Sequence, residues 1–248
     1  VLKRPYVAAG NWVFVGQFKR HLNYLLRKFT PLEHLRLPLP RDEFLITFDD
    51  ALNGVYENAY PLMRERGLKG AIFVITDFIG RRNLWDATFG FPRRHMDKSA
   101  IVELSEAGWI IGSHTTSHRA LTHLNDRELR RELEYSKKYL EDLIGRPVIT
   151  LAYPFGLYDV RVVRMAERVG YRWGFAGPSL GGKFGSMNVP RIPVNLPDVF
   201  LGPKLWEACA PVDILLTLPS KLTPIYQRMR SLLLPKEGRV YEDGRGHD

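Results

Sequence analysis

The sequence predicts an α/β fold in which helices cover a parallel β-sheet. Short apolar runs alternate with amphipathic segments between residues 44 and 194, and this alternation is typical of β/α units. No glycine-rich phosphate loop follows the first strand, which argues against a dinucleotide-binding domain. A barrel-like closure is therefore the better prediction, and it places a functional site where strands end and loops begin.

The apolar periodicity indicates where each element lies along the chain. Strands are expected at 44–48, 70–75, 109–113, 148–154, 171–176 and 191–194. Helices are expected at 12–29, 55–66, 98–107, 126–144 and 159–169. Gly67 and Gly145 follow two of these helices directly, as glycines at helix C-termini do.

Composition divides the chain into three segments. Residues 1–40 are expected to form a helix and a proline-containing connector that pack on the barrel. Residues 41–195 carry the β/α alternation and are the expected catalytic domain. Residues 196–248 change in character and are expected to form a helical extension, with an amphipathic stretch at 221–234, and a flexible tail.

The formal net charge is +9, and all of the excess falls within residues 1–195. A solvated basic surface is the simplest interpretation, and an anionic polymer or an envelope surface is the partner that this charge favours. No nucleic-acid recognition motif accompanies the charge, so no nucleic-acid partner is expected. No apolar run reaches about 18 residues and no signal peptide is evident. The basic surface slightly favours an extracytoplasmic or envelope location, with a cytoplasmic location as the alternative.

Polar residues follow three of the expected strands directly. Asp49 and Asp50 come after the first strand, His114 and His118 follow the strand 109–113, and the turn 153–156 ends the strand 148–154. Because the carboxyl ends of parallel strands meet at one rim, these residues are expected to lie close together. Two adjacent carboxylates repel each other, and burial strengthens the repulsion, so either both point into water at an ordinary turn or a cation lies between them.

The two histidines lie at positions i and i+4 and would share one face if the segment were a helical turn, an arrangement that suits a metal ion. The zinc-protease pattern is not met, because Thr115 stands where its catalytic glutamate would be. A general base would then come from the aspartate pair. The alternative is that both histidines are ordinary polar loop residues. Cys209 is the only cysteine, which excludes a cysteine-based zinc site.

Three ordered motifs resemble those of the polysaccharide deacetylases of carbohydrate esterase family 4. They read Thr47-Phe48-Asp49-Asp50, His114-Thr115-Thr116-Ser117-His118, and Tyr153-Pro154-Phe155-Gly156, the last like the family's Tyr-Pro-Phe-Gly branch. The resemblance covers roughly residues 40–195. It implies a distorted (β/α) barrel, TIM-like with about seven strands.

The resemblance also implies roles for individual residues. Asp50, His114 and His118 would hold a divalent metal, usually zinc in this family, with cobalt or nickel as alternatives. Asp49 would stay unliganded and act as general base on the metal-bound water. The backbone N–H of Phe155 would help to stabilise the oxyanion. The implied reaction is hydrolysis of the acetamide of an N-acetylated sugar, with an O-acetylated sugar as the less favoured substrate.

The sequence departs from the family pattern in two places. Ala152 replaces the arginine that commonly precedes the third motif and orients the base, and Arg191 would take that role unless it is an ordinary structural arginine. The family's late acid histidine is absent. Asp49 would then return its proton to the leaving group, with His95 or His123 as alternative acids.

Substrate contacts are expected from Tyr153 and Pro154 in the third motif and from Trp85, whose ring offers a platform for a sugar. Trp85 would otherwise cap the core. A catalytically impaired carbohydrate-binding protein of the same fold is the main alternative function. A non-haem iron oxygenase is less favoured, because its two-histidine, one-carboxylate triad usually lies on a different fold.

Overall fold

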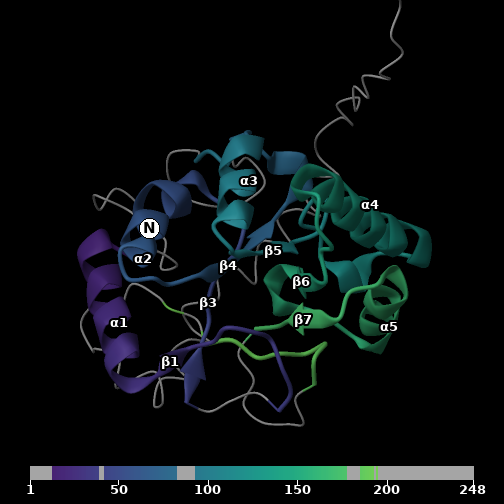
Figure 1. Cartoon of the computed structure of the whole chain (residues 1–248). Helices are drawn as coiled ribbons and strands as arrows, with labels where there is room; N and C mark the ends of the chain where they lie inside the picture. Colours follow the sequence, from purple (N-terminus) through teal and green to yellow (C-terminus); the bar gives the residue numbers. More distant parts are fainter. Residues whose placement is uncertain (1–12, 39–41, 83–92, 178–184, 193, 195–248) are drawn as a thin grey trace, which may run out of the picture.

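The chain folds as a curled half-barrel of parallel strands with helices along its outer side (Figure 1). The computed structural model describes residues 13–38, 42–82, 93–177, 185–192 and 194. Within that part, five parallel strands form one sheet in the order β3-β4-β5-β6-β7, and β1 pairs with β2 separately. The predicted α/β class and distorted barrel are confirmed, with five sheet strands described where about seven were expected.

The strands are β1 (Thr30–Pro31), β2 (Glu43–Phe44), β3 (Ile46–Phe48), β4 (Gly70–Val74), β5 (Ile110–Ser113), β6 (Thr150–Ala152) and β7 (Trp173–Phe175). The helices are α1 (Val15–Lys28), α2 (Tyr60–Arg64), α3 (Lys98–Glu106), α4 (Asp126–Ile144) and α5 (Val160–Val169). Short turns are η1 (Val55–Ala59), which is π-helical, and the 3-10 turns η2 (Thr76–Phe78), η3 (Leu121–His123) and η4 (Pro154–Gly156).

Helix α4 shows how local sequence sets the element boundaries. Asn125 and Glu128 form a reciprocal capping box at its start, each side chain bonding the other residue's backbone N–H. Gly145 ends the helix in the left-handed conformation with φ 65°, which glycine adopts without steric cost. The predicted span 126–144 is confirmed at both ends.

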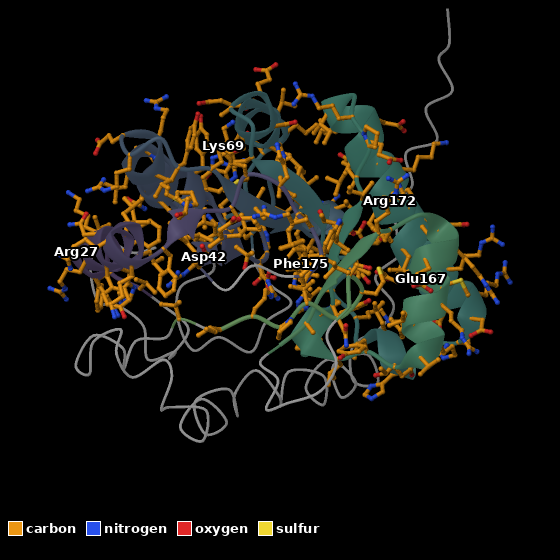
Figure 2. The ribbon with its side chains drawn as sticks, turned by 60° about the horizontal axis from the view of Figure 1, so that its bottom comes forward. Arg27, Asp42, Lys69, Glu167, Arg172 and Phe175 are labelled. Carbon is orange, nitrogen blue, oxygen red and sulfur yellow. The ribbon has the colours of Figure 1, made fainter. Side chains whose placement is uncertain are left out.

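Alternation along the strands fills both faces of the sheet. In β4, Ile72 and Val74 face the cluster under the helices, whereas Ala71 and Phe73 face a smaller cluster inside the curl. Phe175 of β7 packs against Phe73 in that inner cluster, with ring centroids 5.0 Å apart. Figure 2 shows Phe175 in the interior. A filled interior leaves the rim as the place for polar groups.

The predicted strand at 191–194 is wrong. Arg191, Ile192 and Val194 have no strand conformation, and the parallel bridge to Phe175 comes from Val189 instead. The extension predicted at 196–248 lies outside the described residues, as do residues 1–12. Among the helices described, none is long and apolar enough to cross a membrane.

Candidate metal centre and active site

The carboxyl ends of β3, β5 and β6 bring the polar residues together, as their positions in the sequence predict. Asp49 and Asp50 leave β3 in a sharp turn in which Asp50 and Ala51 are left-handed, with φ of 66° and 49°. His114 follows β5 directly, and η4 begins two residues after β6. One rim of the sheet therefore carries all three segments.

Asp50, His114 and His118 converge on one point. Oδ1 of Asp50 lies 3.6 Å from Nε2 of His114 and 3.7 Å from Nε2 of His118, and the two Nε2 atoms are 3.1 Å apart. Ligands about 2.0–2.2 Å from a shared zinc ion at tetrahedral angles lie about 3.3–3.6 Å from one another. The three observed separations lie within about 0.2 Å of this range, so the donor set and its spacing fit a divalent metal.

Burial favours the neutral form of both imidazoles, which is the form that can bind a metal. Desolvation lowers the pKa of His114 and lowers that of His118 well below its ordinary value, so both rings are neutral near pH 7. Nδ1 of His114 lies 2.8 Å from the carbonyl oxygen of Ala152, which fixes a tautomer with the Nε2 lone pair facing Asp50. The ring of His118 packs edge-on against Phe155 at 4.6 Å.

The loop that carries the histidines is not a helical turn, and that interpretation of their spacing is wrong. Thr115 and His118 are both left-handed, with φ of 67° and 58°, and the chain between them has no helical hydrogen bonds. These two reversals, rather than one helical face, turn both rings toward Asp50.

Asp49 lies beside the cluster and is paired with Arg191. The guanidinium donates from Nη1 to Oδ1 at 2.6 Å and from Nη2 to Oδ2 at 2.8 Å, while its Nε donates to the carbonyl oxygen of Ala176. Burial alone would raise the pKa of Asp49, but Arg191, His114 and His118 outweigh it and lower the pKa to about 2. With 34% of its side chain exposed, Asp49 is an accessible carboxylate.

His95 contacts the backbone of the turn at Asp50 and Ala51. Its Nδ1 lies 2.5 Å from the carbonyl oxygen of Asp50, and the N–H of Met96 donates to the carbonyl of Ala51. Burial lowers the pKa of His95 to about 4, so the ring is neutral and has no proton to spare near pH 7. His123 is exposed on η3. The neutral ring of His95 therefore lacks the charged form that a general acid uses.

The third motif differs from the prediction. The ring of Tyr153 is fully buried and its hydroxyl donates to the carbonyl of Met187, and Pro154 is buried as well, so both side chains belong to the core rather than to a substrate surface. Phe155 sits at the rim in a left-handed conformation with φ 60°. Trp85 lies outside the described residues.

The sequence prediction missed Glu132. This residue of α4 is 8% exposed, and its carboxylate accepts hydrogen bonds from the backbone of Thr116 and Ser117. Both lie in the segment 114–118 that carries the two histidines, here called the histidine loop. Its position among the buried residues Leu129, Leu133 and Ser136 was the available signal, because a glutamate inside an apolar stripe needs buried partners.

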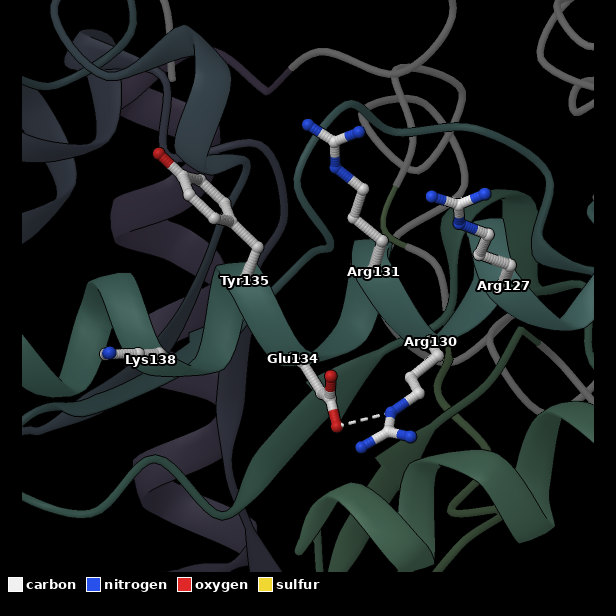
Figure 3. Close-up of a pocket in the computed structure, with 6 residues that line it drawn as sticks. All are labelled: Arg127, Arg130, Arg131, Glu134, Tyr135 and Lys138. Carbon is white, nitrogen blue, oxygen red and sulfur yellow. Dashed lines mark hydrogen bonds and ion pairs between the residues drawn. The ribbon is translucent and has the colours of Figure 1, made fainter. Parts of the chain in front are cut away.

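A shallow hollow of about 400 Å³ lies on the outer face of α4. Figure 3 shows Arg127, Arg131 and Tyr135 pointing to the same side of the helix. The remaining lining residues are Arg130, Glu134 and Lys138. The hollow shares no residue with the aspartate–histidine cluster, and its chemistry is mainly cationic.

Comparison with known proteins places the chain in a family. Residues 37–174 match the profile of a family described as polysaccharide deacetylase, which is more than half of the chain. A putative polysaccharide deacetylase of Bacillus subtilis, YxkH, is 29% identical over 180 residues, which cover 68% of this chain and 60% of that protein. A poly-beta-1,6-N-acetyl-D-glucosamine N-deacetylase of Staphylococcus aureus is 27% identical over 146 residues, 55% of this chain and 48% of that protein. The matched part of this chain thus covers about half to three fifths of the length of these relatives.

Solved structures share the fold. IcaB from Ammonifex degensii superposes with a TM-score of 0.64 at 22% identity, over 80% of this chain and 88% of that one. A de-N-acetylase from Aggregatibacter actinomycetemcomitans gives a TM-score of 0.67 at 17% identity, over 82% and 92%. With the family match over residues 37–174, the chain belongs to the polysaccharide deacetylase family.

Proposed function

We propose that this chain is a metal-dependent deacetylase that hydrolyses the acetamide of N-acetylated sugars in a glycan or polysaccharide. One observation carries the proposal: three ligand atoms of Asp50, His114 and His118 converge beside an accessible carboxylate, Asp49, that Arg191 holds. The name of the Staphylococcus aureus relative, an N-deacetylase of poly-beta-1,6-N-acetyl-D-glucosamine, supports a polymer of N-acetylated sugars as the substrate class.

Asp50, His114 and His118 would hold the metal, with zinc as the first choice and cobalt or nickel as alternatives. Two neutral imidazoles and one carboxylate are donors that suit all three ions. When bound, the ion supplies a Lewis acid that polarises the acetyl carbonyl and makes a water molecule more acidic.

The residues of the chain would divide the proton transfers. Asp49 takes a proton from the attacking water while Arg191 keeps its carboxylate facing the reaction centre. The backbone N–H of Phe155 donates to the carbonyl oxygen as negative charge develops on it. Asp49 then returns the proton to the sugar nitrogen as the carbon–nitrogen bond breaks, and a free amine and acetate leave.

A catalytically impaired carbohydrate-binding protein is the second candidate, and Ala152 in place of the family's arginine favours it. The bidentate pair between Arg191 and Asp49 opposes it, because a guanidinium from another part of the chain occupies the place next to the base.

Metal removal and replacement tests the proposed function. We expect the chelated protein to release no acetate from N-acetylated chitooligosaccharides or from poly-β-1,6-N-acetylglucosamine, and zinc, cobalt or nickel to restore release. O-acetylated glycans are the comparison substrate and should be poorer. A protein that neither retains a divalent metal nor releases acetate with any of these ions would favour the binding-protein alternative.

We further propose that the basic surface favours an anionic envelope polymer, with the hollow on α4 as a contact point. Among the described residues, Arg127 and Lys138 make no ion pair or hydrogen bond, so their charge is available to a partner. Replacing both by glutamate should weaken co-sedimentation with an anionic cell-wall polymer and leave turnover of a neutral chitooligosaccharide unchanged. The matched control carries the same charge change at Arg164 and Arg168 on α5. Equal weakening in the two variants would mean that net charge alone, and not the hollow, determines binding.

A further inference from the structure

One buried carboxylate fastens the histidine loop to α4. Oε2 of Glu132 accepts hydrogen bonds from the backbone N–H of Thr116 at 3.0 Å and of Ser117 at 2.9 Å. Oε1 accepts from the Ser117 hydroxyl at 2.5 Å, and the Glu132 carbonyl accepts from the Thr116 hydroxyl at 3.0 Å. Four hydrogen bonds from one residue thus reach the two residues between the flanking left-handed positions.

The loop depends on these bonds because its conformation is unfavourable by itself. Thr115 and His118 occupy the left-handed region, which residues other than glycine seldom adopt. The five backbone N–H groups of residues 114–118 all donate hydrogen bonds. The N–H of His114 donates to the carbonyl of Val74, that of Thr115 to the Ser113 hydroxyl, and that of His118 to the Thr115 hydroxyl. The N–H groups of Thr116 and Ser117 both donate to Glu132. Without Glu132, two consecutive N–H groups of the loop would lose their acceptor.

We infer that Glu132 is a positioning residue that fixes the separation of the His114 and His118 rings and thereby sets metal affinity. The inference rests on the proposed function, in which these rings hold the ion. Both oxygens of Glu132 are engaged by the loop, so the carboxylate acts through the loop rather than as a ligand or a base. Its effect is exerted on the 3.1 Å spacing between the two Nε2 atoms.

The geometry also says which substitutions should be tolerated. Glutamine has the same length, and its oxygen accepts from the backbone N–H groups while its amide donates to the Ser117 hydroxyl. Aspartate keeps the charge but is one methylene shorter, so it draws back from the loop. Alanine removes all side-chain acceptors. Glu134 offers a matched control, because it is an exposed glutamate on the same helix, where it pairs with Arg130.

The experiment compares wild type, Glu132→Ala, Glu132→Asp, Glu132→Gln and Glu134→Ala. Metal affinity is measured by chelator competition, the ligand geometry by the visible absorption of the cobalt form, and protection of the Thr116 and Ser117 amides by hydrogen exchange without metal. We expect the alanine and aspartate variants to bind metal about 10- to 100-fold more weakly. They should also show an altered cobalt spectrum and faster exchange at these amides. The Glu132→Gln and Glu134→Ala variants should resemble wild type.

Wild-type affinity, spectrum and amide protection in folded Glu132→Ala would overturn the inference. If that variant does not fold, Glu132→Asp decides the question by the same three measurements. A wild-type protein that binds no metal would instead refute the proposed function. In that case the exchange rates of the metal-free variants still show whether Glu132 holds the loop.

Discussion

Replacing Asp49 by asparagine should lower acetate release by about 10²- to 10⁴-fold, the range by which general bases contribute, and leave metal content unchanged. Asparagine matches aspartate in shape and still accepts a hydrogen bond from Arg191, but it cannot take a proton from water. Asp50→Asn should instead lose bound metal, and turnover with it, because Oδ1 of Asp50 faces both histidines at 3.6 and 3.7 Å. Acetate release and bound metal, measured on the same preparations, separate the two aspartates.

His118→Ala is the control for loss of the metal site, and it should lose both metal and turnover. If Asp49→Asn loses as much metal as Asp50→Asn, the two aspartates have been assigned the wrong way round. Full turnover in Asp49→Asn would remove Asp49 from the reaction altogether.

Replacing Arg191 by methionine should have the next largest effect, a fall in turnover with little change in bound metal. Arg191 is the bidentate partner of Asp49, with only 18% of its side chain exposed, so its loss frees the base to rotate. The pKa of Asp49, about 2 with Arg191 present, should rise, because burial then acts with less opposition. The acidic limb of the kcat/KM profile should therefore move to higher pH.

Lysine at position 191 is the matched variant, since it keeps the charge and loses the bidentate geometry. We expect Arg191→Lys to restore the acidic limb more than the maximal rate. The measurement is a pH–rate profile of acetate release at saturating metal. An unchanged maximal rate and an unchanged profile in Arg191→Met would show that Arg191 is an ordinary structural arginine.

The sequence predicted those parts of the fold that depend on neighbouring residues. The capping box and the terminal glycine of helix α4 lie within residues 125–145, so neighbouring residues determine both of its ends. The predicted bounds of this helix are confirmed. The strand ends before Asp49 and His114 could also be located, because apolar runs stop there, whereas the strand predicted at 148–154 runs two residues past the end of β6 at Ala152. The convergence of these ends follows from parallel strand order alone.

Other features depend on contacts between distant segments, which periodicity cannot show. The spacing of His114 and His118 suggested a helical turn, whereas left-handed residues and Glu132 shape the loop. The sequence places Tyr153 at a strand end on the rim, whereas in the structure its side chain is buried and its hydroxyl donates to the carbonyl of Met187. Arg191 is indicated by the alanine at the family position and by its place at a predicted strand end, but its contact with Asp49 spans 142 residues.

That span has a consequence for how the protein acquires activity. Asp49 follows the first strand of the sheet, and Arg191 comes after the last, beyond residue 174 where the family match ends. A contact between such distant segments forms only after the chain between them is ordered, because closing so long a loop costs entropy before it is rewarded. A chain that ends before residue 191 would lack the partner of Asp49, however well its proposed metal ligands were placed. Turnover would then appear late in folding, after metal binding, and would report the completion of the sheet.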